Sequence, residues 1–411
     1  MNSQGIIELL LRCQPRRHSK PLFKVVIIAL FILTCTQMAL RTSGLDTRYN
    51  HNVLDWPSRT TMFCGGNVTG YAQKFFRMKS VIYEPTTDSF QLVCKNEHLP
   101  PRYSFIENTH GVKKYIHRIG HVIKEPPSET IRHRGLSIIV DRCMAHNYYH
   151  TMQDWYNVFL MSKFFSFDFK STSLFLIDRS PGFHTDTQWK SLFPGVTKLN
   201  DSKTPLYFDD VVFSPPGPSN PMEYWELPQL PFMEEFSRAF LSKFDLVSDK
   251  KLNCKNLTIT LTIRRDYFLH PGTDVLQKRN TQRKFKNENE LVSALRRHFP
   301  GHVIQTLVAE DMSLKEQLSL VVNTDIMAGM HGCALTNMWF MPRHGAIFEM
   351  YPKYWEIKYH YSSIARWRDI RYRYWRNQRK ENEYQDHYTY VPPEVLVQNL
   401  NALKEEIGCL S

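Results

Sequence analysis

The segment 323–350 constrains the fold of this chain more than any other part of it. It contains two short apolar runs, Ile326–Met330 and 346–350, separated by His331-Gly332 and an apolar stretch at 335–341. This order predicts one βαβ unit, in which a strand, a tight glycine turn, a helix, a loop and a second strand follow one another. Glycine lacks a Cβ, so a ligand can approach the backbone there, and the free N–H groups of the next helix favour an anion. We therefore expect this turn to hold a diphosphate.

Strand and helix patterns alternate on both sides of residue 250. The expected strands are 136–140, 173–177, 209–213, 257–263 and 302–308, and the expected helices begin at Asn147 or span 231–244, 288–298 and 313–322. This alternation predicts an α/β protein with two facing Rossmann-like domains and a cleft between them. A polar stretch at 248–254 separates the two patterns, so we place an N-terminal domain at 61–248 and a C-terminal domain at 249–411.

The first 41 residues do not fit a globular domain. Basic residues precede an apolar run at 22–40, whose length approaches the roughly 20 residues that span a bilayer. The basic residues predict a cytosolic tail at 1–21. Because no small-x-small cleavage site follows the apolar run, we prefer an uncleaved signal-anchor to a removed signal peptide. Residues 41–60 then form a stem, and the rest of the chain is expected to be lumenal. The sequons at Asn67 and Asn256, which lie on that side, are compatible with glycosylation.

The cysteines fit a lumenal placement. Six of them follow the predicted anchor, an even number in an oxidising compartment. Cys64 with Cys94 and Cys254 with Cys409 are candidate disulfide bridges, although sequence spacing does not determine connectivity. The spacings resemble no zinc site, and no Asp-x-Asp triplet occurs in the chain, so we expect no metal ion.

The formal net charge of +12 raises nucleic acid as a partner. Part of this charge lies in the N-terminal tail, and part lies at 353–380, where six arginines alternate with tyrosines and tryptophans. A lumenal location argues against nucleic acid. Two alternatives stay open for this segment: a basic aromatic cleft for an anionic sugar nucleotide, or a solvated basic face.

Several segments together resemble glycosyltransferase family 61. The residues GMHGCALT at 329–336, FMP at 340–342 and Phe348-Glu349 are similar to the family pattern GMHGAGLT…FLP…E. Residues 283–291 look like its RxIxNExEL segment, and residues 147–154 resemble its NxxHxxxD segment. The resemblance implies a GT-B-like, inverting transferase that uses a UDP-sugar and no cofactor.

The resemblance also implies a donor, an acceptor and a location. The chain is similar to branches that transfer N-acetylglucosamine to EGF domains or add β-1,2-linked xylose, so the implied donor is UDP-N-acetylglucosamine or UDP-xylose. The implied acceptor is a lumenal glycoprotein, through an EGF-like domain or an N-glycan. The chain does not end in a retrieval tetrapeptide, which together with the anchor points to a type II Golgi membrane protein, with the endoplasmic reticulum as the alternative. The alternative function is that of a catalytically inactive, lumenal glycan-binding relative.

Inverting transfer needs stabilisation of the departing diphosphate. Arginine suits this role because its guanidinium donors form a fork, and the ends of parallel strands line the ligand crevice of an α/β sheet. Each candidate also has a plainer alternative, such as a tight turn, a solvated loop charge or an edge carboxylate in a salt bridge. The expected donor-binding residues are Arg264, Arg265, Arg283, His331, Gly332, Cys333, Ala334 and, for the ribose hydroxyls, Glu349. Of these, Cys333 and Ala334 stand where the family pattern has Ala and Gly.

The transfer also needs a base that takes the proton of the acceptor hydroxyl. His150 and Asp154 are four residues apart on one helical face, so the carboxylate can orient the imidazole. They lie in the N-terminal domain, opposite the expected diphosphate seat. The alternative is a polar helix pair near the surface, and His146 and Asn147 could substitute.

Overall fold

The second half of the chain forms a five-stranded parallel sheet with strand order β14-β10-β15-β16-β17. Its strands are β10 (Thr258–Ile263), β14 (Val303–Val308), β15 (Ile326–Met330), β16 (Ala346–Tyr351) and β17 (Arg371–Arg376). Strands β10, β15 and β16 are buried along their whole length, as a parallel sheet covered on both faces requires. The four strands that the sequence predicts here are confirmed, whereas β17 was not predicted.

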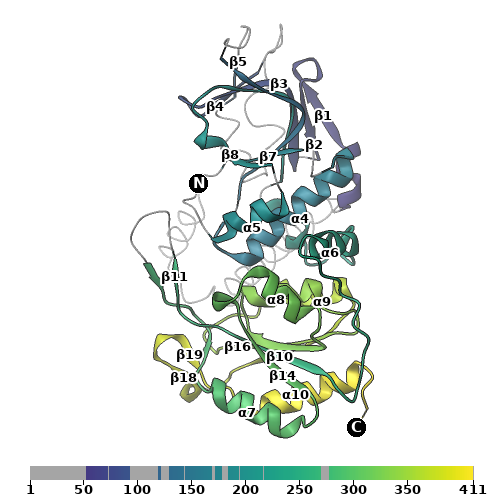
Figure 1. Cartoon of the computed structure of the whole chain (residues 1–411), viewed down its shortest axis with the longest axis vertical. Helices are drawn as coiled ribbons and strands as arrows, with labels where there is room; N and C mark the ends of the chain where they lie inside the picture. Colours follow the sequence, from purple (N-terminus) through teal and green to yellow (C-terminus); the bar gives the residue numbers. More distant parts are fainter. Residues whose placement is uncertain are drawn as a thin grey trace, which may run out of the picture. The chain divides into compact units, whose positions relative to one another are not determined.

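Helices cover both faces of this sheet (Figure 1). On one face lie α7 (Glu288–His298) and α10 (Pro393–Glu406), and on the other lie α8 (Leu314–Val321), α9 (His360–Arg368) and the 3-10 helix η7 (Cys333–Phe340). Neighbouring residues of a strand point to opposite faces, so Ile326 packs in the core with α7 while Met327 packs in the core with α8. The segment after the glycine turn is helical, as predicted, but its hydrogen bonds are of the 3-10 type and not α-helical.

The first half of the chain forms a nine-stranded mixed sheet with main order β1-β2-β3-β9-β6-β7-β8, to which β4 and β5 add through β3. Its strands are β1 (Thr60–Phe63), β2 (Val68–Tyr71), β3 (Phe75–Glu84), β4 (Ser89–Leu92), β5 (Ile119–His121), β6 (Ile131–Val140), β7 (Ser173–Leu176), β8 (Val196–Lys198) and β9 (Leu206–Phe213). Strands β9, β6, β7 and β8 are parallel, as expected of a Rossmann-like unit. The pairs from β1 to β4 are antiparallel and therefore depart from that expectation. The reason is local: these strands follow one another through short turns, and a parallel pair needs a crossover of about a dozen residues or more.

The described residues of this half form the helices α4 (Tyr148–Phe165), α5 (His184–Leu192) and α6 (Met233–Ser242). Helix α4 begins where predicted, because the Asn147 side chain caps it by accepting a hydrogen bond from Tyr149 N at 3.0 Å. Helices α4 and α6 contact η7 through aromatic side chains. Phe240 stacks on Phe340 with ring centroids 4.8 Å apart, and Tyr156 lies 5.6 Å from Trp339. One hydrophobic core thus contains side chains from both halves of the chain.

Two small sheets complete the fold. One pairs β11 (Tyr267–Leu269) with β12 (Gln277–Arg279), and the other contains β13 (Lys284–Phe285), β18 (Glu383–Tyr384) and β19 (Tyr388–Thr389). The predicted bridge between Cys254 and Cys409 is confirmed, with the two Cα atoms 5.2 Å apart. Cys64 is also disulfide-bonded, and its expected partner Cys94 lies outside the described residues.

The structure is a computed structural model that describes residues 52–72, 74–92, 119–121, 129–142, 144–168, 172–177, 184–193, 195–215, 217–269 and 277–410. The predicted tail, anchor and most of the stem lie outside these ranges. Within them, no helix combines the length and the apolar character needed to cross a membrane. Contacts group Val53–Ser411 into one unit, so the boundary at 248/249 stays a prediction.

Candidate functional site at the switch point of the parallel sheet

The strand order of the parallel sheet reverses once, beside β10. The second strand in sequence, β14, lies on one side of β10, and the chain then crosses to β15 on the other side. Ligands of open α/β sheets bind where the order reverses in this way, outside the carboxyl ends of the strands. Arg264 directly follows β10 and His331 directly follows β15. The structure therefore brings these two predicted residues to the same point of the sheet.

Arg264 lies directly against Gly332. A Cβ added to Gly332 would be 1.8 Å from Arg264 Nη1, a distance at which two atoms cannot coexist. The glycine is needed for this space and not for its backbone conformation, since its φ of 174° is an extended angle that any residue adopts. Arg264 Nε donates to the Gln282 carbonyl at 3.0 Å, and Tyr361 OH donates to the Gly332 carbonyl at 2.7 Å. Both sides of the contact are thus held in place.

Arg283 adds a second guanidinium. Its central carbon lies 4.0 Å from the centroid of the Trp355 ring, which is a cation–π contact. Burial, together with the nearby charge of Arg264, lowers the pKa of Arg283 to about 10, so it stays protonated at neutral pH. Among the described residues, neither Arg264 nor Arg283 forms an ion pair with a carboxylate. Arg265 differs, because it is exposed and pairs with Glu288 at 2.7 Å.

His331 is oriented by a buried carboxylate. Its Nδ1 donates to Glu349 Oε1 at 2.5 Å, while Tyr372 OH donates to Glu349 Oε2, also at 2.5 Å. The Glu349 side chain is fully buried, so the structure gives it this role in place of the ribose contact that we expected. Burial and then the Glu349 carboxylate raise the pKa of Tyr372, which keeps its proton on the hydroxyl. His331 is thereby held with Nδ1 protonated, and it stacks on Tyr351 at 5.0 Å.

The two residues after Gly332 begin η7. Ala334 is buried with its side chain in the core, so only its backbone can face a ligand. Cys333 is a free, partly buried thiol that packs against the same core. The Gly332 carbonyl accepts from Leu335 N at 3.0 Å, which closes the first turn of the helix. The structure offers no further account of the cysteine at this position.

His360, on α9, was not predicted. Its ring lies 6.1 Å from His331, 4.9 Å from Tyr149 and 5.1 Å from Trp225. Burial, followed by the charges of His331 and His150, lowers the pKa of His360 to about 4. It therefore lies close enough to interact with both predicted histidines. Sequence reasoning missed it because α9 falls in the basic aromatic segment 353–380, where arginines obscure the helical pattern.

His150 lies in the first turn of α4, as predicted, but with a different partner from the one expected. Its Nδ1 contacts Gln153 Oε1 at 2.8 Å, and Gln153 Nε2 donates to Glu223 Oε1 at 2.5 Å. Asp154, which we expected to orient the imidazole, lies on α4 itself and is only 1% exposed. The carboxylate at the end of this chain of hydrogen bonds is thus Glu223, which follows Gln153 by 70 residues.

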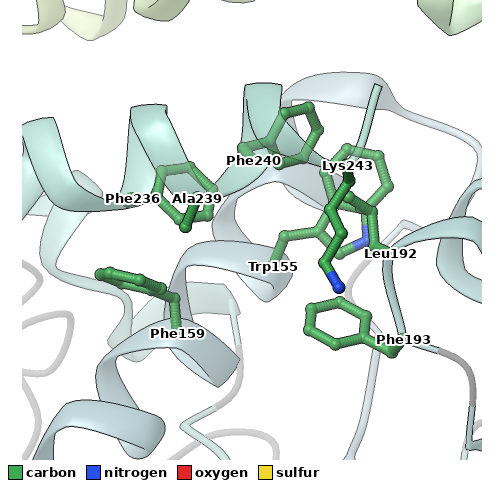
Figure 2. Close-up of a pocket in the computed structure, with 8 residues that line it drawn as sticks. All are labelled: Trp155, Phe159, Leu192, Phe193, Phe236, Ala239, Phe240 and Lys243. Carbon is green, nitrogen blue, oxygen red and sulfur yellow. The ribbon is translucent and has the colours of Figure 1, made fainter. Parts of the chain in front are cut away.

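A cavity of about 50 Å³ lies apart from these residues, between α4 and α6 (Figure 2). Its walls are aromatic and aliphatic side chains, with the Lys243 amine at one side. Ligand pockets for molecules of drug size are about 300–1,000 Å³, so this cavity is too small for a nucleotide-sugar. The candidate site is therefore defined by the contacts around Gly332.

A profile for the family described as Glycosyltransferase 61 matches residues 49–348. This chain belongs to the glycosyltransferase 61 family. The family 61 match contains His150, Arg264, Arg283 and the turn at 331–334, and it ends one residue before Glu349. The resemblance noted from the sequence is thereby confirmed.

Individual proteins also match parts of the chain. The β-1,2-xylosyltransferase RCN11 of Oryza sativa subsp. japonica is 23% identical over 263 residues, which cover 57% of this chain and 48% of that protein. The EGF domain-specific O-linked N-acetylglucosamine transferase of Drosophila melanogaster is 37% identical over 100 residues, 24% of this chain and 19% of that protein. The protein of the same name from Mus musculus is 37% identical over 108 residues, with coverage of 26% and 20%. The aligned parts thus span half or less of these relatives.

Proposed function

We propose that this family 61 member is an inverting glycosyltransferase that transfers N-acetylglucosamine or xylose from a UDP-sugar to a lumenal glycoprotein. The observation that carries the proposal is the close approach of Arg264 to Gly332 at the switch point of the parallel sheet. A guanidinium fork matches phosphate oxygens, and backbone N–H groups at the start of η7 add to the same positive field. The activities named for the two similar transferases of Oryza sativa and Drosophila melanogaster supply the two candidate sugars.

In this proposal the diphosphate of the donor lies between Arg264 and Arg283. The two guanidiniums repel each other, and a diphosphate between them would replace that repulsion with two charge-assisted contacts. The backbone N–H groups of Cys333 and Ala334 complete the seat. His331 joins them in the doubly protonated form, in which Nδ1 donates to Glu349 and Nε2 donates to the diphosphate. The charge that develops on the leaving diphosphate is then stabilised by fixed donors, so transfer needs no metal ion.

His150 acts as the base in the same proposal. It lies on α4. The His360 ring lies 6.1 Å from His331 and 4.9 Å from Tyr149, the neighbour of His150, which supports placing the acceptor hydroxyl between α4 and the donor turn. We propose an EGF-like domain or an N-glycan as the acceptor.

We also propose that the run at 22–40 anchors the protein in the Golgi membrane, with the catalytic part in the lumen and with glycans at Asn67 and Asn256.

Calorimetric titration of UDP into the purified full chain tests the donor site. We expect saturable binding without added metal, and Arg264→Ala should raise the Kd roughly 10- to 100-fold because a charged hydrogen bond is lost. Arg373→Ala is the matched control, since Arg373 is an exposed arginine that pairs with Glu406 on another part of the sheet. If UDP does not bind, or if both variants bind it as the wild type does, the proposed donor site is incorrect.

A further inference from the structure

One side chain, that of Gln153, connects the proposed base His150 to a carboxylate on a distant segment. His150 Nδ1 contacts Gln153 Oε1 at 2.8 Å, and Gln153 Nε2 contacts Glu223 Oε1 at 2.5 Å. His150 and Gln153 are three residues apart on α4, so they lie on one face of the helix. Glu223 ends the short 3-10 helix η5 (Pro221–Glu223). The order imidazole, amide, carboxylate is therefore fixed by tertiary structure.

The chemistry of these groups allows only one arrangement of protons. An ionised carboxylate has acceptors and no donor, so Glu223 must receive a hydrogen from the Gln153 NH₂ group. The remaining amide atom, Oε1, is an acceptor that faces His150 Nδ1. Nδ1 must then carry the hydrogen, and in a neutral imidazole the lone pair is left on Nε2. The amide orientation thus determines the tautomer of the histidine.

The backbone around this chain of hydrogen bonds is also held in place. Asn220, fully buried, donates from Nδ2 to the Gln153 carbonyl at 2.6 Å and accepts from Met222 N at 2.7 Å. Asn220 therefore connects η5 to α4 at Gln153, the residue whose side chain joins His150 to Glu223. Gln153 is itself fully buried, so water does not compete for its amide.

We infer that Gln153 and Glu223 are positioning residues that hold His150 as the Nδ1–H tautomer, with Nε2 available to take the acceptor proton. This inference rests on the proposed function. In the step, the acceptor oxygen bonds to the anomeric carbon of the sugar while its proton passes to Nε2. The bond from that carbon to the diphosphate oxygen breaks, and the diphosphate leaves with the electron pair.

Nitrogen NMR of the full chain with ¹⁵N-labelled histidine tests the tautomer without any substrate. His150→Gln assigns the signal, and the measurement is made at about pH 8, where an ordinary imidazole is neutral. We expect the Nδ1–H form in the wild type and a shift towards the Nε2–H form in Gln153→Leu, which cannot accept a hydrogen bond. An Nε2–H form in the wild type, or the same tautomer in both proteins, would overturn the inference.

Kinetics with UDP-N-acetylglucosamine and UDP-xylose test the consequence. Gln153→Leu should lower kcat about 10-fold or more with the donor KM and the Kd for UDP unchanged, because the base is misoriented while the donor site is intact. Glu223→Gln should keep most of the activity, since its side-chain oxygen can still accept from the Gln153 amide. In a His150→Ala background, Gln153→Leu should cost nothing further.

The control is Asn157→Ala, which removes another buried amide of α4, one that donates to the Pro215 carbonyl at 2.8 Å. This variant should lose stability and keep both kcat and the His150 tautomer. If Gln153→Leu lowers kcat equally in the presence and absence of His150, its role is structural and the inference fails. If no UDP-sugar is turned over and UDP does not bind, the proposed function fails, and the NMR result alone decides the tautomer.

Discussion

The guanidinium of Arg264 occupies the space that a side chain at residue 332 would need, with Nη1 1.8 Å from the position of a Cβ on Gly332. Gly332→Ala should therefore displace Arg264 and weaken UDP binding roughly 10-fold or more. Calorimetry with UDP measures the effect. In the Arg264→Ala background the added methyl group should have little further effect, because the atom with which it clashes is gone. Additive losses in the double variant would show that Arg264 is not the reason for the glycine.

The orientation of His331 depends on a second hydrogen bond to Glu349. Tyr372→Phe removes the donor to Oε2 and leaves a buried carboxylate oxygen unpaired, so we expect a loss of about 1–3 kcal/mol in the free energy of unfolding. Turnover should fall as well, since the carboxylate that holds Nδ1 becomes free to move. Tyr374→Phe, on the same strand but 52% exposed, should leave both quantities unchanged. Equal behaviour of the two variants in urea titrations and in assays would contradict this account.

A buried charge network holds the start of β15. The Asp325 side chain is fully buried, and its Oδ2 accepts from Lys250 Nζ at 2.5 Å and from Thr258 N at 2.6 Å. Its Oδ1 contacts His344 Nε2 at 2.7 Å. Asp325→Asn leaves buried donors without an acceptor, so we expect a loss of about 3 kcal/mol or more in urea denaturation.

The control for Asp325 is an exposed ion pair. Asp245 lies 3.7 Å from Lys315 at the surface, and its left-handed φ of 59° is one that asparagine tolerates. Asp245→Asn should change the free energy of unfolding by less than about 0.5 kcal/mol. A loss at Asp325 no larger than the loss at Asp245 would show that the network does not stabilise the fold.

His360 should make stability depend on pH. Its pKa is lowered from 6.5 to about 4 by burial and by the neighbouring His331 and His150, so below pH 6.5 the unfolded chain takes up the proton first. Stability is therefore lost as the pH falls, by roughly 2 kcal/mol at pH 5 from this group alone. The free energy of unfolding of His360→Gln, relative to that of the wild type, should be higher at pH 5 than at pH 8. Urea titration at each pH measures both values. A difference between the two proteins that does not change with pH would contradict the shift.

Periodic segments of the sequence were predicted well because their signals are local. The strand Ile326–Met330 and the helix Glu288–His298 have the predicted bounds, since apolar residues recur there at the spacing of one element. The position of Arg264 beside the glycine turn was also foreseeable, because strand ends meet at one edge of a parallel sheet. The mixed first sheet was not, as residues 60–92 pair through hairpins whose short strands carry little pattern.

The partners of the predicted histidines could not be predicted in the same way. Spacing on a helix made Asp154 the expected partner of His150. In the structure the partner is Gln153, whose amide in turn donates to Glu223. The 3-10 helix that carries Glu223 reaches α4 only through tertiary contacts such as that of Asn220. Glu349 was predicted as a site residue, but its contact with His331 depends on how β15 and β16 pair.

The central claim is that this chain transfers a sugar from a UDP-sugar bound at the turn after β15. The most direct test is UDP release by the full chain from UDP-N-acetylglucosamine and UDP-xylose, with an EGF-like domain or an N-glycan as acceptor and with the product anomer determined by NMR. We predict acceptor-dependent UDP release from one of the two donors, a β-linked product, and a loss of about 10-fold or more in kcat/KM in Arg264→Ala. Glycan binding without UDP release from either donor, or release that Arg264→Ala does not reduce, would contradict the account.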